Sequence, residues 1–218
     1  MITLLPALDG EHIRLEPLQP GHAAGLARAA AGDPALYRWT TVPQGPAAAA
    51  AYVAAALAQR DAGTAAPFAV LGAGDGCVLG STRLRDLSWW PWPAGHPRSG
   101  REAPDVCEIG HTWLARAAVG TAANPAAKLL LLGHAFEVWE VQSVCFHTDA
   151  RNERSRRALH RIGARFEGIL RAHRLAADSV PRDSARFSVT AAEWPAVRLH
   201  LRQLAAAADP VPVRGGGC

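Results

Sequence analysis

The sequence predicts an α+β domain with a mixed sheet, and two observations lead to this class. Short apolar runs bounded by Gly, Pro, Asn or Asp alternate with longer segments whose apolar residues recur every three or four positions, as in strands and helices respectively. The chain has 218 residues, of which 49% are apolar, so it can bury one substantial core. We therefore expect a single domain over 1–210 and a flexible tail at 211–218.

The first half predicts one strand, two helices and a three-stranded meander. Ile13, Leu15 and Leu18 alternate with polar residues, which is typical of a strand. A proline opens each of the two helical segments that follow, and a Gly-rich turn at 72–76 joins two strands of the meander. In chain order we expect a strand at 13–18, helices at 20–31 and 46–62, and strands at 68–71, 78–84 and 106–114.

The second half predicts helices and strands in alternation. Asn124 is expected to cap a helix whose first residue is Pro125, because Asn favours the cap position and Pro the first turn. After it we expect a strand at 144–148, a helix at 152–162, a strand pair at 165–170 and 185–189, and a last helix at 194–208. An insert at 88–104 is too rich in Pro and Gly for regular structure, yet it holds three of the seven tryptophans.

Charge and cysteine content narrow the range of ligands. The net charge is +4, and one arginine cluster, near the helix at 152–162, suits a phosphorylated small ligand better than a long nucleic acid. The four cysteines show neither a CxxC pair nor the spacing of a zinc site, so no metal is expected. Without a long apolar run or a signal peptide, we expect a cytoplasmic protein with no membrane partner. The cluster comprises Arg151, Arg154, Arg156, Arg157 and Arg161.

A short loop between the strand at 106–114 and the following helix has the composition of an anion site. Its backbone N–H groups and the N-terminus of the helix can hold an anion such as a pyrophosphate. Lys128 lies one turn into the helix, where its ammonium can reach a phosphate. The spacing matches neither a Walker A loop nor GxGxxG. The loop residues are Gly120, Thr121, Ala122, Ala123 and Asn124.

Four separated segments resemble the GCN5-related N-acetyltransferase (GNAT) superfamily, and within it the Rim-type branch. They are EIGHTWL at 108–114, GTAANPAAKLLLLGHAFE at 120–137, TDARNERSRRALHRIGARFEG at 148–168 and EWP at 193–195. The resemblance implies a central, splayed, mostly antiparallel seven-stranded sheet flanked by helices. It also implies an N-acetyltransferase that moves an acetyl group from acetyl-CoA to a primary amine, either a protein N-terminus or an amino-bearing small molecule, by direct transfer in a ternary complex.

The resemblance further implies where the cofactor lies. Pantetheine is expected to pair with the strand backbone at Thr112, Trp113 and Leu114, and the pyrophosphate to lie on the loop at 120–124. Asn152 is expected to contact the pantetheine arm, and Ser155, one turn later on the same helix face, to point at the thioester sulfur. Arg157 is our choice for the 3′-phosphate.

The chemistry requires a neutral amine, an oxyanion donor and protonation of the leaving thiolate. Glu108 is our candidate base, helped if partial burial raised its pKa, and His111 is second because a regular strand would point it to the opposite face. Leu159 occupies the place where many relatives carry a catalytic tyrosine, so we expect Ser155 or water to serve the thiolate. Trp89, Trp90 and Trp92 of the insert are candidates for an acceptor pocket or a dimer contact.

Three alternatives remain at this stage. Leu159, and Ala117 in place of the usual Arg or Gln of the phosphate loop, are compatible with a sensor that binds acyl-CoA without turnover. The same fold can also use another donor, succinyl-CoA or an aminoacyl-tRNA. Self-association into a homodimer is undecided by the sequence.

Overall fold

A computed structural model describes residues 5–32, 34–176 and 179–212. Its central feature is a sheet whose strands follow the order β1-β2-β3-β4-β5-β6-β8-β7. All neighbouring strands are antiparallel except β5 and β6, which are parallel, so the mixed sheet is confirmed. The strands are β1 (Leu8–Asp9), β2 (Ile13–Pro17), β3 (Ala65–Gly72), β4 (Val78–Ser88), β5 (Val106–Leu114), β6 (Ser143–Asp149), β7 (Arg165–Leu175) and β8 (Pro181–Thr190).

The sheet differs from the predicted one in two ways. It has eight strands rather than seven, because β1 is only two residues long and too short to show a periodic pattern. The β7–β8 hairpin extends well beyond 170 and its second strand begins at Pro181 rather than 185. Its outer part is rich in Arg, His, Asp and Ser and has few apolar side chains, so it lacks the apolar alternation that predicts a strand.

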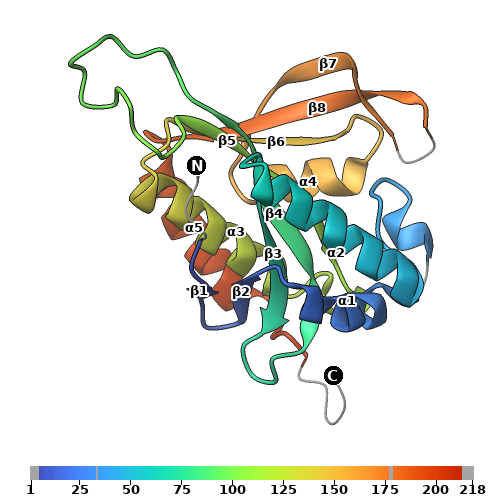
Figure 1. Cartoon of the computed structure of the whole chain (residues 1–218). Coiled ribbons are helices and arrows are strands. Elements are labelled where there is room, and N and C mark those ends of the chain that lie inside the picture. Colours follow the sequence, from blue (N-terminus) through green and yellow to red (C-terminus); the bar gives the residue numbers. More distant parts are fainter. Residues whose placement is uncertain (1–4, 33, 177–178, 213–218) are drawn as a thin grey trace.

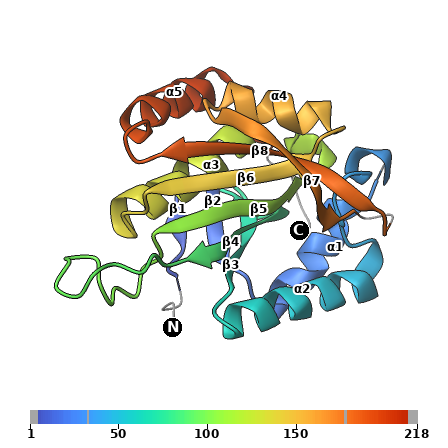
Figure 2. The same ribbon diagram turned by 90° about the horizontal axis from the view of Figure 1, so that it is seen from above.

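Helices cover both faces of the sheet (Figures 1 and 2). One face carries α3 (Ala123–Gly133), α4 (Glu153–Arg161) and α5 (Trp194–Ala207), and the other carries α1 (Ala23–Ala30) and α2 (Gly45–Asp61). Two hydrophobic clusters follow this division. The larger one packs α3 and α5 against the sheet around Phe68, Phe146 and Phe187, and the smaller one packs α1 and α2 around Leu26 and Val53.

The start of α3 differs from the prediction. The helix begins at Ala123, and its cap residue is Ala122 rather than Asn124. The oxygen that accepts from the first turn comes from Thr121, whose Oγ1 lies 3.2 Å from the Ala123 N. The main-chain carbonyl of Asp209 takes the Ala122 N–H at 2.9 Å. A hydroxyl two residues earlier and a distant carbonyl therefore replace the predicted cap.

The insert forms an ordered loop that extends beyond the sheet where β4 ends and β5 begins (Figure 1). Asp105, which is buried, accepts hydrogen bonds from the Trp90 N and the Trp92 Nε1. Arg98 and Arg101 bind main-chain carbonyls in the segment between α3 and β6, at Glu140 and Trp139. The predicted tail at 211–218 lies outside the described residues from 213 onward. No helix in the described part of the chain is long and apolar enough to cross a membrane.

Candidate active site

A gap opens between β5 and β6. The two strands pair only at 106–108 and 143–145, and beyond this point no ladder bond joins them in the described residues. The backbone of β5 from 109 to 114 therefore presents N–H and C=O groups to the gap that no strand pairs. A cavity of about 620 Å³ lies here. Its walls come from β5, β6, α3, α4, the segment 36–41 and the β7–β8 hairpin.

A β-bulge bends β5 beside the gap. One residue of β4, Thr82, faces two residues of β5, His111 and Thr112. His111 has a φ of 49°, in the left-handed region that residues with a Cβ rarely adopt. The expectation that His111 points away from Glu108 assumed a regular strand and is wrong, because the bulge brings both side chains to the cavity wall.

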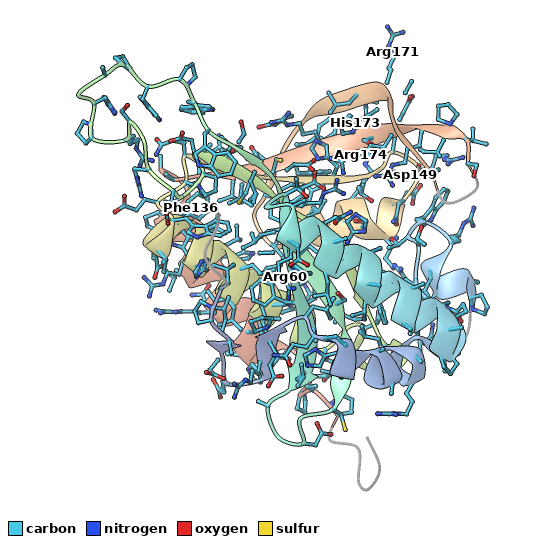
Figure 3. The ribbon with its side chains drawn as sticks, viewed as in Figure 1. Arg60, Phe136, Asp149, Arg171, His173 and Arg174 are labelled. Carbon is cyan, nitrogen blue, oxygen red and sulfur yellow. The ribbon has the colours of Figure 1, made fainter. Side chains whose placement is uncertain are left out.

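Glu108 is held in a network of charged hydrogen bonds at the closed end of the gap. Its side chain is buried, and its two oxygens accept from Arg174 at 3.1 and 2.6 Å. The Oε2 also lies 2.8 Å from the His147 Nδ1. Figure 3 shows Arg174 next to His173 on the hairpin that closes this side of the molecule. The carboxylate is thus fully engaged by two residues that the sequence analysis did not identify.

This network lowers the proton affinity of Glu108. Burial alone would raise its pKa, but hydrogen bonds from His147 and Arg174 and their charges outweigh burial, so the pKa lies well below 4.5. The shift is opposite to the one a general base needs.

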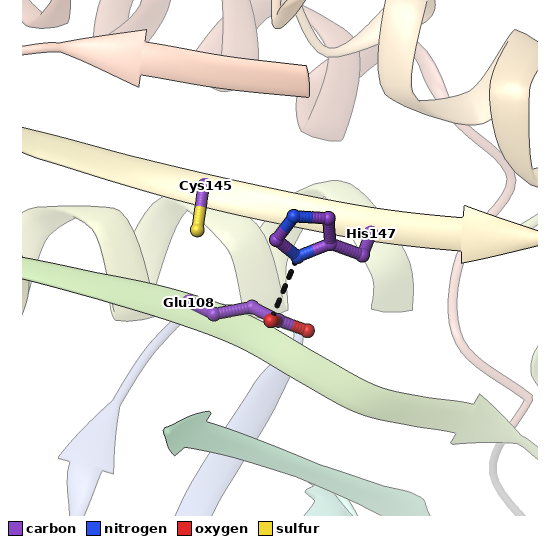
Figure 4. A group of neighbouring side chains, drawn as sticks. All are labelled: Glu108, Cys145 and His147. Atoms are coloured by element: carbon purple, nitrogen blue, oxygen red, sulfur yellow. Dashed lines mark hydrogen bonds and ion pairs between the residues drawn. The ribbon is translucent and has the colours of Figure 1, made fainter. Parts of the chain in front are cut away.

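Cys145 lies next to Glu108 and His147 (Figure 4). The Glu108 carboxylate, the Cys145 thiol and the His147 imidazole have ligand atoms within 4.8 Å of one another, which is close enough to hold a metal ion. Burial and the neighbouring Glu108 raise the pKa of the Cys145 thiol to about 12, so a thiolate ligand is costly here. A metal would also have to displace Arg174 from the carboxylate. We interpret the group as an ion-pair network.

His111 faces the cavity as a neutral imidazole. Burial, together with the charges of Arg83 and Arg85, lowers its pKa to about 4. The Arg85 Nη1 lies 2.7 Å from the His111 Nε2, which must therefore accept, and this leaves the proton on Nδ1. Such a ring is a hydrogen-bond donor at neutral pH and a poor base.

Lys128 lies at the floor of the gap. It is buried, and its Nζ donates to the Thr112 Oγ1 at 3.0 Å and lies 5.6 Å from the centre of the Phe146 ring. No carboxylate pairs with it among the described residues. Burial therefore lowers the pKa of Lys128 to about 7. The ammonium lies between the diverging strands, rather than at the helix N-terminus where the sequence placed it.

Only part of the predicted phosphate loop faces the cavity, where it could contact a ligand. Gly120, Thr121 and Asn124 line the cavity. Ala122 and Ala123 do not, because both are buried and their N–H groups are taken by Asp209 and Thr121. Their assignment as cofactor contacts is therefore not supported by this geometry.

The N-terminal part of α4 forms another wall. The Asn152 Oδ1 accepts from the Ser155 N at 3.1 Å, so Asn152 caps the helix and lines the cavity at once. Ser155 lines it too, one turn along. Arg157 lines the wall and pairs with Glu153 on the exposed side of the helix.

Two other parts of the wall were not expected from the sequence. Tyr37 lies 77 residues before Leu114, yet its hydroxyl donates to the Leu114 carbonyl at 3.1 Å inside the cavity wall. Arg182 joins the wall from β8, opposite Arg174. Neither position has a local sequence signal, since only the folded chain brings these segments to β5.

The residues predicted for the site therefore divide into two groups. The structure places none of the insert tryptophans, Trp89, Trp90 and Trp92, in the cavity wall, so their role as an acceptor pocket within this cavity is not supported. The residues that it brings together around the cavity are Glu108, His111, Thr112, Trp113, Leu114, Gly120, Thr121, Asn124, Lys128, Asn152, Ser155 and Arg157.

Comparison with known proteins agrees with this geometry. Residues 12–165 match the family model described as an acetyltransferase (GNAT) domain. A GCN5-related N-acetyltransferase from Brucella melitensis shares 28% identity with a TM-score of 0.77, over 92% of this chain and 86% of the other. A provisionally named acetyltransferase from T. thermophilus shares 34% identity with a TM-score of 0.74, over 94% and 99%.

A more distant structure has the same fold. Mycobacterium smegmatis RimJ, solved in complex with CoA-disulfide, shares 21% identity with a TM-score of 0.71, and the alignment covers 90% of each chain. A comparison with curated proteins finds no match.

Proposed function

Because the chain belongs to the GNAT acetyltransferase family and is an acyl-CoA-dependent N-acyltransferase, we propose that it transfers an acetyl group from acetyl-CoA directly to a primary amine. The observation that carries this proposal is the gap between β5 and β6. It offers unpaired strand backbone to an amide-bearing arm, and Gly120, Thr121 and Asn124 to phosphates.

The donor's thioester belongs near the closed end of the gap. Pantetheine amides can extend the sheet along 109–114, as an added strand would. Thr121, Asn124 and Arg157 then lie at the open end, where the phosphates leave the gap. The bulge at His111 interrupts the strand at the cavity wall, so we assign the oxyanion to backbone N–H groups of this part of β5 and to the His111 ring.

Lys128 is our candidate for stabilising the leaving thiolate. A free thiol has a pKa of about 8.5, and burial brings the Lys128 pKa to about 7. The proton therefore moves downhill from the ammonium to the sulfur, so Lys128 can do what the missing tyrosine does in relatives. The Ser155 hydroxyl can assist from the opposite wall.

Glu108 fits a positioning role better than that of a base. Its carboxylate fixes Arg174 and His147, and its lowered pKa keeps it charged at neutral pH. The amine must then arrive neutral or lose its proton to water.

The test combines calorimetry with a thiol-release assay. We expect acetyl-CoA to bind and CoA to be released when an amine acceptor is present. Ala158→Trp places a large ring in the cavity wall on α4, so it should weaken binding at least 100-fold. The exposed Ala206→Trp on α5 is the matched control and should bind as the parent does. A parent protein that gives no binding heat with acetyl-CoA contradicts the proposal.

A second candidate is an acyl-CoA sensor without turnover. Leu159 lines the cavity where relatives carry the catalytic tyrosine, which favours it. Tight binding without thiol release for any amine would support the sensor over the enzyme.

A further inference from the structure

The cavity wall has an excess of positive charge. Only one carboxylate, that of Glu108, lies in the described wall. Arg174 divides its bonds between Glu108 and Asp86, and Arg85 binds the same Asp86. These two arginines and two carboxylates balance. Asp149 also lies near β8, but Arg151 already binds both of its oxygens, so a further cation finds no free carboxylate among the described residues. The basic residues of the wall are Arg85, Lys128, Arg154, Arg157, Arg161, Arg174 and Arg182.

Arg182 is that further cation. It lies directly across the hairpin from Arg174. Its side chain makes no hydrogen bond or ion pair with any residue that the structure describes, although the Asp149 charge acts on it. Its Nε is buried without a partner. A half-buried guanidinium with an unused donor is costly, unless a ligand supplies the acceptor.

The neighbouring groups respond to this positive potential. His111 has its pKa lowered by burial and then by Arg83 and Arg85, and His173 by burial and then by Arg174. An ammonium placed here experiences the same repulsion, which lowers its own pKa and favours the neutral, nucleophilic amine. A polycation would be repelled outright. A single amine with a negative group beside it would be attracted.

We propose that the acceptor is an amine carrying a carboxylate close to its amino group, and that Arg182 pairs with this carboxylate. The inference rests on the proposed function, since it names the acceptor of that transfer. Two sources share this chemistry: a free amino acid and a peptide N-terminus followed by an acidic residue.

Matched acceptor pairs distinguish the sources. Thiol release from acetyl-CoA is measured with alanine against alaninamide, and with Ala-Asp-Ala-amide against Ala-Asn-Ala-amide, as kcat/KM per neutral amine. Spermidine represents polycations. We expect the carboxylate member of one pair to be favoured about 10-fold or more, because charged hydrogen bonds to a half-buried arginine are strong. The first pair would identify an amino acid and the second an acidic N-terminus.

Variants then connect the preference to Arg182. Arg182→Gln should bring the ratio within that pair close to one, and Arg182→Lys should restore part of it. Arg202→Gln, on the exposed side of α5, should leave the ratio unchanged. Thermal unfolding checks that each variant folds.

The outcomes separate two failures. The inference is overturned if spermidine is the best acceptor, or if the amide member of both pairs reacts faster. It is also overturned if the preference for the carboxylate member remains in Arg182→Gln. In each of these cases the proposed function stands. Binding of acetyl-CoA without release for any acceptor also rejects the inference, and favours the sensor. Absence of acetyl-CoA binding removes the proposed function itself and the inference with it.

Discussion

Single buried charges set how this protein responds to pH and to mutation. Glu108 and Lys128 both line the cavity, yet their environments push them in opposite directions. The carboxylate is stabilised in its charged form by two partners, whereas the ammonium is destabilised by burial without a carboxylate partner among the described residues. A different prediction therefore follows for Glu108 and for Lys128.

Glu108→Gln should destabilise the fold by about 2 to 3 kcal/mol, because it leaves Arg174 beside a buried neutral group. The substitution should also change how the free energy of unfolding depends on pH in the acid range. A carboxylate with a lowered pKa stabilises the fold above its unfolded value, and this contribution is lost as the pH falls through the folded pKa. The parent should therefore lose stability below pH 4.5 more steeply than the variant. Urea unfolding between pH 3 and 7 measures both effects; identical slopes would show that Glu108 is not charge-stabilised.

Lys128→Met should separate stability from activity. The folded pKa of about 7 lies below the usual 10.5, so the unfolded chain binds more protons between these values and parent stability should rise with pH across that range. Methionine removes the buried charge, so the variant should be at least as stable at pH 7 and lack this rise. Its kcat should fall about 100-fold if Lys128 serves the thiolate. A less stable variant with normal kcat would argue for a purely structural lysine.

The chemistry of single residues was predictable only in part. The sequence placed Glu108 correctly on a strand facing the site, since strand periodicity is local. The direction of its pKa shift was not predictable, because Arg174 lies 66 residues away and carries no motif. Tyr37 was not predicted as a site residue for the same reason, because Leu114, to which it donates, lies 77 residues later.

At the scale of elements, the site forms where regular secondary structure is interrupted, at the bulge in β5 and at the gap between β5 and β6. Strand positions and the mixed sheet followed from apolar alternation, and most helices from their Pro and Gly boundaries. The bulge at His111 was missed, because a residue with a Cβ gives no sequence signal for a positive φ. The early start of α3 was missed since its first-turn acceptors come from Thr121 and from the distant Asp209.

The predicted role of the insert at 88–104 as an acceptor pocket is not supported by the cavity wall. Asp105, which holds the insert through Trp90 and Trp92, offers a direct test. Asp105→Ala removes the acceptor for the Trp90 N and the Trp92 Nε1, so amide exchange over 89–104 should become faster and stability should fall by about 2 kcal/mol. Because the insert does not line the cavity, the KM for acetyl-CoA should not change. Exchange followed by mass spectrometry, with the exposed Glu102→Ala as control, measures this. A large rise in KM would return the insert to the active site.

At the scale of the whole molecule, the gap between β5 and β6 divides one sheet into two parts. On one side β1 to β5 are backed by α1 and α2, and on the other β6, β8 and β7 carry α4 (Figure 2). The parts are joined by the short pairing at 106–108 and by α3, which spans beneath both. A ligand that pairs with β5 and contacts α4 would therefore bridge them.

This arrangement predicts that acetyl-CoA acts as a structural link between the two parts. At 100 times its Kd the ligand should raise the unfolding free energy by about 2.7 kcal/mol through mass action alone. The added protection should be uneven: amides at 109–114 and the first turn of α4 should slow most, since these border the gap, while those of α1 should change little. Hydrogen exchange with and without acetyl-CoA, with Ala158→Trp as the non-binding control, tests the pattern. Protection spread evenly over the chain would mean that the ligand stabilises the fold globally, without bridging the gap.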